Sequence, residues 1–306
     1  MENLLQTLAT GIMVGGTYAL MCVGLGLIFG VMRVINFAQG DFLMLGMYAA
    51  FYAFTYLGVG AVFGVYFGPI VAAFLAGPIV FVIAWFLHWL LLARVSGTAA
   101  QGAEAEGHYA QLILTLGIAL VLQNGGLLIF GSWPQSIRTP LSNEAWFIEP
   151  VFFNKSRMVA FCVALGVALV LYLFMNRSGY GKALRAAADN PDAAIYMGID
   201  VNRAHRLAFA IGIAVTAIAG GLVAMYYPFQ PYVGLEFVII MYTGVVLGGL
   251  GSIMGAFWGG MTVGLVQQLS TLVLPIQLQN TAIFVVFLLI VLFRPQGLFG
   301  RSVERM

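Results

Sequence analysis

The chain has 306 residues, of which 62% are hydrophobic and only 8% are charged. A soluble domain has about a quarter of its residues charged, so this composition excludes an ordinary soluble fold and indicates a chain surrounded mostly by lipid. The net charge of +2 is too small to favour nucleic-acid binding.

Long apolar segments separated by short polar loops recur along the whole chain. No charged residue stands between Glu2 and Arg33, and this interval exceeds the ~20 residues that a helix needs to cross a bilayer. A second charge-free interval, 42–93, is long enough for two spans with a turn near 58–64. These stretches are continuous rather than alternating, which favours helices over strands.

We therefore predict an all-α, polytopic transmembrane helical bundle of about nine spans (8–10), forming a single domain over residues 1–306. The spans are expected at residues 5–31, 42–58, 66–92, 110–131, 158–175, 207–228, 237–251, 254–274 and 280–294. The glycine-dense segments around 248–260 are the exception, because one of them is equally compatible with a broken or re-entrant helix buried in protein.

The basic residues predict the orientation, because cytoplasmic loops carry an excess of Lys and Arg. The most charged segment, 177–206, contains five of them, and the tail 294–306 contains three. Both segments are therefore expected in the cytoplasm. Alternation of the spans then puts the N-terminus outside.

Several glycines recur at a spacing of four residues, as in Gly11 and Gly15 or in Gly251, Gly255 and Gly259. Within lipid, small residues at this spacing let two helix backbones approach closely. The pattern leaves two interpretations open. The glycines pack helices together within one bundle, or they form an interface with another subunit.

The segment 177–206 contains a short helix whose two ends are marked in the sequence. Asn190 is a good capping residue, Pro191 suits the first helical position, and Asp192 suits the positive end of a helix. Gly198 is suited to the left-handed conformation that ends many helices. A helix of about two turns is thus predicted over 191–197. It is either a docking element for another protein or part of an ordinary interfacial loop.

Three polar side chains, Asn36, Gln39 and Asp41, stand between two strongly apolar runs. If they lie within the membrane they mark a translocation pathway, because buried polar groups are costly there. If they lie at the rim they form only a turn. The polar residues inside other predicted spans either line a pathway or join helices by hydrogen bonds. These residues are Gln123, Asn124, Gln267 and Gln268.

No sequence motif for catalysis, metal binding or nucleotide binding is present. The phosphate-loop pattern fails because Lys182 is followed by Ala183 rather than Ser or Thr. His88, His108 and His205 lie on different segments, so no metal site is expected. We predict a non-catalytic subunit that binds no cofactor of its own.

Five stretches distributed over the chain resemble the permease subunits of branched-chain amino acid ABC importers, the hydrophobic amino acid uptake family, and specifically the smaller, first permease of the pair. The order and spacing of the stretches carry the resemblance. They are Gly-Gly-Thr-Tyr-Ala-Leu at 15–20, the segment 35–48, the segment 181–199, the glycine-rich segment 246–256 and Arg-Pro-Gln-Gly-Leu-Phe-Gly at 294–300. The family often has His at the position of Gln39 and Glu at that of Asp41.

The resemblance implies an assembly in the bacterial inner membrane, with the C-terminus in the cytoplasm. A second permease chain would complete the pathway as a heterodimer, two cytoplasmic ATPases would bind ATP and Mg, and a periplasmic binding protein would deliver the substrate. Branched-chain or other hydrophobic amino acids, related amides and small organic acids are the substrates implied. The predicted short helix would match the coupling helix that contacts the ATPase. Its residues would be Asn190, Pro191, Asp192, Ala193, Ala194, Tyr196, Met197 and Gly198.

Two other classes remain as alternatives. An ATP-independent channel or secondary transporter for a small polar solute would often have ionisable groups in the middle of its spans, and this chain has almost none. An intramembrane enzyme would need a nucleophile and a base, and the sequence shows no such pair.

Overall fold

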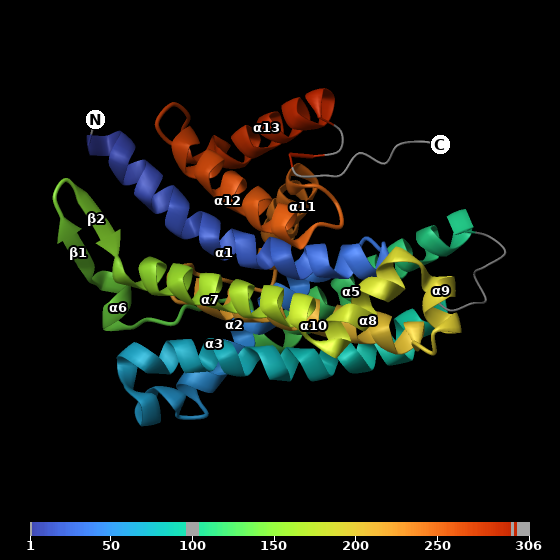
Figure 1. The fold of residues 1–306 in the computed structure, drawn as a ribbon. Coiled ribbons are helices and arrows are strands. Elements are labelled where there is room, and N and C mark those ends of the chain that lie inside the picture. The colour runs from blue at the N-terminus through green and yellow to red at the C-terminus, as the bar shows by residue number, and fades with distance from the viewer. Residues whose placement is uncertain (1, 96–103, 295–296, 299–306) are drawn as a thin grey trace.

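The computed structural model describes residues 2–95, 104–294 and 297–298, which form a bundle of helices (Figure 1). Each predicted span has a helix at its position, with ends that differ from the prediction by up to seven residues. The long helices are α1 (Glu2–Met32), α2 (Gln39–Thr55), α3 (Val59–Leu87), α5 (Glu104–Phe130), α7 (Lys155–Arg177), α10 (Val201–Val223), α11 (Val233–Gly248), α12 (Ile253–Ser270) and α13 (Gln279–Phe293).

Shorter elements connect these helices. They are the π-helix η1 (His88–Leu92), α4 (Ala93–Val95), α6 (Pro140–Asn143), β1 (Ala145–Ile148), β2 (Val151–Asn154), α8 (Gly179–Asp189), α9 (Pro191–Tyr196) and the 3-10 helix η3 (Ile276–Leu278). Five helices of the described part, α1, α3 with η1, α5, α7 and α10, are individually long and apolar enough to cross a membrane. The basic tail beyond residue 298 lies outside the described residues.

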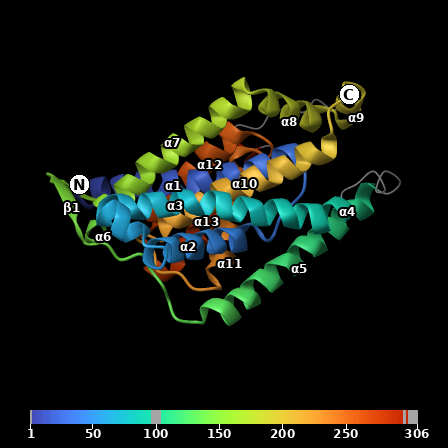
Figure 2. The same cartoon turned by 90° about the horizontal axis from the view of Figure 1, so that it is seen from below.

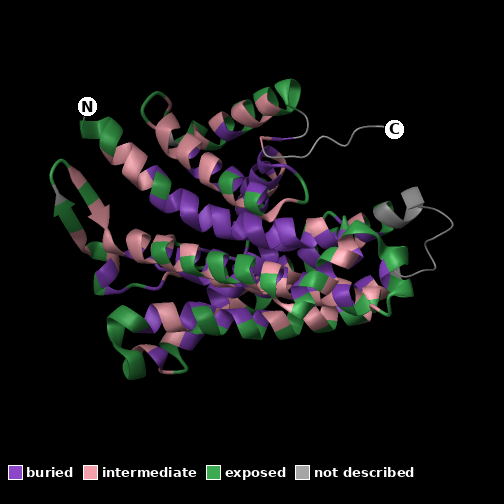
Figure 3. Ribbon diagram, viewed as in Figure 1, coloured by how far each residue is buried: buried purple, intermediate pink, exposed green. Residues whose placement is uncertain are grey.

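Helix α1 runs through the bundle with most of its length buried, and α7, α8, α10, α11 and α12 pack against it (Figure 3). Its apolar stretch is 89% buried and that of α10 is 72% buried, whereas the values for α3, α7 and α5 are 33%, 28% and 22%. The inner helices therefore form the core. The outer three expose most of their apolar surface to lipid or to another subunit.

Close glycine contacts within the chain hold α1 and α11 against α12. A Cβ atom added at Gly264 would lie 2.3 Å from the Cα of Gly15, and one added at Gly259 would lie 2.0 Å from the carbonyl oxygen of Gly244. Only glycine permits such backbone approaches, and they gain dispersion contacts that a larger residue would prevent. These glycines thus pack helices within one bundle, which decides between the two interpretations of their spacing.

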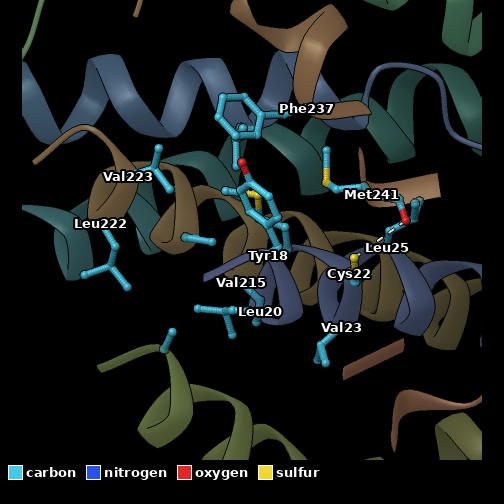
Figure 4. Close-up of a cluster of buried hydrophobic side chains, with 14 of the residues drawn as sticks. Tyr18, Leu20, Cys22, Val23, Leu25, Val215, Leu222, Val223, Phe237 and Met241 are labelled. Atoms are coloured by element: carbon cyan, nitrogen blue, oxygen red, sulfur yellow. Dashed lines mark hydrogen bonds between the residues drawn. The ribbon is translucent and has the colours of Figure 1, made fainter. Parts of the chain in front are cut away.

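Larger side chains fill the space between α1, α10 and α11 (Figure 4). The ring of Tyr18 packs edge-on against that of Phe237 with 6.1 Å between centroids. The Cys22 thiol donates to the carbonyl oxygen of Met241 at 3.6 Å. Aromatic edges and a polarizable sulfur fit irregular gaps between helices and add contact energy.

The turn predicted near 58–64 is present between α2 and α3. Gly58 has a φ of 71°, and Gly64 has a φ of 75° inside α3, where the helix is kinked. Both values lie in the left-handed region that glycine occupies without a steric penalty.

The connection 132–157 contains a two-stranded antiparallel sheet that the sequence analysis did not predict. Strands β1 and β2 pair Ala145 with Asn154 and Ile148 with Val151. The side-chain amide of Gln6, on α1, donates to the carbonyl oxygen of Phe152 at 2.8 Å and accepts from the Phe152 N–H at 2.7 Å. This hairpin is therefore bound to the first turns of α1, at the opposite end of the bundle from α9 (Figure 1).

Candidate translocation and coupling sites

A buried row of polar side chains joins the segment after α1 to α10. The Asn36 side-chain amide donates to Gln39 Oε1 at 3.0 Å, and Gln39 Nε2 donates to the Thr216 hydroxyl at 2.6 Å. That hydroxyl donates to the carbonyl oxygen of Gly212 at 3.0 Å. Asn36, Gln39 and Thr216 are each 0% exposed. We call these three residues the polar junction.

The polar junction lies inside the bundle rather than at its rim. Residues 33–36 are irregular and a turn follows, so that α2 begins at Gln39 beside the second half of α10. The start of α11 meets the start of α2 there, because a Cβ added at Gly40 would lie 2.0 Å from the carbonyl oxygen of Gly234. Irregular backbone at this depth is tolerated because protein surrounds it and satisfies its polar groups. The structure shows that the polar junction is buried in protein; its placement within the membrane and its part in a pathway stay predictions.

Asp41 lies in the first turn of α2 beside the polar junction. Its side chain is 3% exposed, and its Oδ1 atom has no hydrogen-bond partner among the described residues. A buried carboxylate oxygen without a partner is unusual, and it leaves this oxygen able to accept a hydrogen bond.

The other pathway candidates do not converge on Asp41. Gln267 of α12 is 6% exposed and donates to the Asn280 side chain of α13 at 3.3 Å. Gln123 of α5 is buried, with its Nε2 atom unpaired among the described residues. Asn124 is exposed and donates to the Leu120 carbonyl oxygen of its own helix.

Sequence reasoning missed several polar residues that the fold brings together between α1 and α11. The hydroxyls of Thr17 and Tyr226 are 2.9 Å apart, and the Tyr227 hydroxyl donates to Glu236 Oε2 at 2.9 Å. The guanidinium of Arg157 lies 5.7 Å from the Tyr226 ring centre. Isolated hydroxyls in apolar helices carry no periodic pattern, so only their position in the fold reveals them.

The short capped helix predicted at 191–197 is present as α9. The Asn190 side chain accepts from the Ala193 N–H at 3.0 Å, Pro191 occupies the first turn, and Gly198 has a φ of 79°. The preceding helix, α8, begins at Gly179, where the Ser178 side chain accepts a hydrogen bond from the Gly181 N–H.

The surface of α9 divides into a buried side and an exposed side. Ala194 is 3% exposed, whereas Tyr196 is 89% exposed and Met197 is 81% exposed. Two large apolar side chains in solvent at the tip of a capped helix are costly in isolation, and such residues are enriched in protein–protein contacts. Ala194 serves to hold α9 against the rest of the chain.

One arginine links α8 to the end of α1. Arg33 Nη2 donates to the carbonyl oxygen of Ala188 at 3.3 Å, and Arg33 has a φ of 54°. Leu184 and Ala187 are buried beneath α8. The C-terminal end of α8, from which α9 continues, is therefore attached to the helix that precedes the polar junction.

The part of the chain that the structure describes contains no group of three or more His, Cys, Asp or Glu side chains arranged to hold a metal ion. His88 is 1% exposed, with both ring nitrogens unpaired among the described residues and its ring 5.5 Å from that of Phe209. His108 belongs to the residues whose side chains are not described.

A many-spanning helical bundle, a buried polar junction and an exposed capped helix at one end together define a membrane transport component. Comparison with known proteins narrows this class. The family described as "Branched-chain amino acid transport system / permease component" matches residues 7–293. The chain belongs to this family, so the prediction of an importer permease made from the sequence is confirmed.

Named relatives align over nearly the whole chain. The chain is 34% identical to the high-affinity branched-chain amino acid transport system permease protein BraD of Pseudomonas aeruginosa, covering 97% of this chain and 96% of BraD. It is 32% identical to the permease protein LivH of Escherichia coli strain K12, with the same coverage. A probable LivH of Methanocaldococcus jannaschii is 27% identical over 82% of this chain and 76% of that protein. No solved structure matches the chain significantly.

Proposed function

We propose that this chain is the smaller transmembrane subunit of an ATP-binding-cassette importer for branched-chain amino acids. A second permease chain pairs with it, two cytoplasmic ATPases drive the assembly, and a periplasmic binding protein delivers the substrate. The names of the relatives support this substrate class. The observation that carries the mechanism is α9, whose apolar tip is exposed at one end of the bundle.

In this proposal α9 contacts the ATPase and moves with it. Its motion reaches α8 first, because Ala194 fixes α9 to the bundle and α8 precedes it directly. The Arg33 hydrogen bond then carries the motion to the end of α1 and the segment that leads to the polar junction. Packed helices move as rigid pieces between discrete arrangements, so a small shift at α9 alters how α2 and α11 meet.

The second permease would cover the face that contains α5. This helix is 22% buried and leans away from the other helices (Figure 2). Its few neighbours include α2, through Gly126, whose added Cβ would lie 3.2 Å from the side chain of Met44. A pathway between this face and a partner would have mainly apolar walls, which suit aliphatic side chains, with Asp41, Asn36 and Gln39 nearby as the polar groups.

Nucleotide chemistry belongs to the partner subunits in this proposal, and the permease itself is not catalytic. The phosphate-loop pattern is absent from the sequence, and ATP and Mg would be held by the ATPases. The basic segment 177–206 favours a cytoplasmic position for α9, which places α9 where the ATPases are.

Reconstitution of the complete importer in vesicles tests the proposal. ATP hydrolysis should rise when leucine-loaded binding protein is added, and Tyr196→Ala with Met197→Ala should abolish that rise while leaving the permease inserted. Tyr56→Ala is the matched control, because Tyr56 is 73% exposed and follows the end of α2, outside the 177–206 segment. Uptake that continues after ATP depletion, or a double variant with normal stimulation, would contradict the proposal.

The structure also changes which residues of α9 are suitable for this test. Replacement of both Ala193 and Ala194 by aspartate would also disrupt α9. Ala194 is buried, so an aspartate there would bury a charge and destabilise the fold directly. Substitutions at Tyr196 and Met197 alter only exposed surface.

A further inference from the structure

A cavity of about 880 Å³ opens at the α9 end of the bundle, and two of the helices that form it, α3 and α7, are mostly exposed. It is formed by α3, α7, α8 and α10 together with the link 198–200. Most of its lining is apolar. The larger apolar residues are Phe81, Val82, Trp85, Phe174, Leu184 and Leu207.

Two arginines of α10 stand at this cavity. Arg203 lines it, is exposed, and forms no ion pair among the described residues. Arg206 places its guanidinium 5.3 Å from the ring centre of Trp85, a lining residue, and its buried Nε has no hydrogen-bond partner in the described part of the chain. Asp200 also lines the cavity, but its carboxylate accepts the Arg203 backbone N–H at 2.9 Å as a helix cap.

We propose that this cavity is a binding site for a phospholipid with an anionic headgroup. The phosphate and the headgroup lie at Arg203 and Arg206. There they supply the negative charge that would pair with the two guanidinium groups. An acyl chain lies between α3 and α7, along Phe81 and Phe174. Such a phospholipid has an anionic headgroup and an apolar acyl chain, and a basic pocket between transmembrane helices beside an apolar groove can bind both parts. A soluble anion would leave the apolar wall in water, so the lipid is the better occupant.

The position of the site gives the lipid a direct route to α9. Gly198, Ile199 and Asp200 line the cavity and form three of the four residues that link α9 to α10. A lipid bound in the cavity would contact this link and restrict its movement. Anionic lipid would then change how firmly α9 is held. The binding claim itself depends only on the cavity and does not rest on the proposed transport function.

Trp85 provides a spectroscopic reporter inside the cavity. The full chain, with its other four tryptophans replaced by phenylalanine, is reconstituted in phosphatidylcholine vesicles that contain brominated phosphatidylglycerol or, separately, brominated phosphatidylcholine. Bromine quenches tryptophan at contact distance. We expect stronger quenching by the brominated phosphatidylglycerol at equal mole fraction. Arg203→Ala should reduce that preference about fivefold, the effect expected for one basic residue against an anionic lipid.

Two further variants separate specific binding from general attraction of anionic lipid. Arg203→Lys should retain part of the preference, because it keeps the charge and loses the fork of donors. Arg294→Ala, at an exposed arginine beyond α13, should retain all of it. Equal quenching by the two brominated lipids in the wild-type sequence would overturn the proposal and make the cavity an ordinary lipid contact. An equal loss in Arg203→Ala and Arg294→Ala would also overturn it.

Discussion

Gln39 donates a hydrogen bond of 2.6 Å to the hydroxyl of Thr216, across 177 residues of sequence and at a point where neither side chain is exposed. The bond joins the first residue of α2 to the second half of α10. The transport role of the polar junction remains a prediction, whereas its structural role can be measured directly.

Thr216→Val should destabilise the bundle, because it leaves the Gln39 amide without an acceptor. Interhelical hydrogen bonds in membranes contribute about 0.6 kcal/mol on average and up to about 1.7 kcal/mol. A double-mutant cycle with Gln39→Leu, measured by unfolding in mixed micelles, should give a coupling energy of about 0.5–1.5 kcal/mol. A coupling energy near zero would show that the bond has no energetic role.

Measuring both uptake and membrane abundance separates a folding role of the polar junction from a transport role. If Gln39→Leu or Asn36→Leu lowers uptake more than it lowers abundance in the membrane, the polar junction also serves translocation. Equal losses of uptake and abundance would leave it a purely structural element.

Gly40→Ala should disrupt the meeting of α2 and α11. The new methyl group would lie 2.0 Å from the Gly234 carbonyl oxygen and 2.7 Å from its carbon, so the two backbones must separate. Overpacking of this kind costs about 1–3 kcal/mol or more. The melting temperature in detergent and the membrane abundance should both fall.

Gly166→Ala in α7 is the control for that substitution. No atom lies within 4 Å of a Cβ added there, and alanine is up to about 1 kcal/mol better than glycine in a helix. Its melting temperature should therefore stay the same or rise. If both alanine variants behaved alike, the contact between Gly40 and Gly234 would have no special importance.

A substitution at Arg33 removes the hydrogen bond that connects α8 to the end of α1, and it should do so without unfolding the chain. Arg33→Gly relieves the positive φ of 54°, a conformation that costs a side-chain-bearing residue about 1–2 kcal/mol, but it removes the bond to Ala188. We expect a permease at least as stable as the wild type, with ATP hydrolysis less dependent on loaded binding protein. Measurement of hydrolysis per substrate transported checks this. Normal coupling in Arg33→Gly would refute the role of the arginine.

The ion pair at the hairpin predicts a dependence of stability on pH. The hydrogen bond from Lys155 lowers the pKa of Glu144 below its usual range. A carboxyl with a lowered folded pKa stabilises the native state above its unfolded pKa, about 4.3, and loses this effect as the pH falls through the folded value. The melting temperature of Glu144→Gln should lie below that of the wild type at pH 7, and the difference should disappear in acid.

The control for the pH experiment is Glu149→Gln. Glu149 is an exposed carboxylate in the turn of the same hairpin. Its replacement removes a carboxylate from the hairpin without touching the Lys155–Glu144 ion pair. A difference between wild type and Glu144→Gln that persisted at pH 2 would exclude the ion pair as its cause.

The sequence predicted those features whose determinants are local. The spans follow from apolar length alone, and α9 follows from Asn190, Pro191 and Gly198, which lie within a few residues of each other. The hairpin was missed because each strand has four residues and because Gln6, which binds it, is 146 residues away. Thr216 was missed for the same reason, since its role exists only beside Gln39. The burial of Ala194 depends on the tertiary position of α9, and no pattern over six residues predicts it.

The hydrogen bonds of Gln6 to Phe152 give the bundle two mechanically different ends. The hairpin end is fastened, because α1, β2 and the start of α7 are tied together there by side chains. The α9 end is connected through short segments, with Ser178 between α7 and α8, the four-residue link 197–200 between α9 and α10, and hydrogen bonds from Arg33 and Arg185. Force applied at α9 would therefore rotate the long helices about their hairpin end. The helix ends near α9 would be displaced most, and the helix ends near the hairpin would be displaced least.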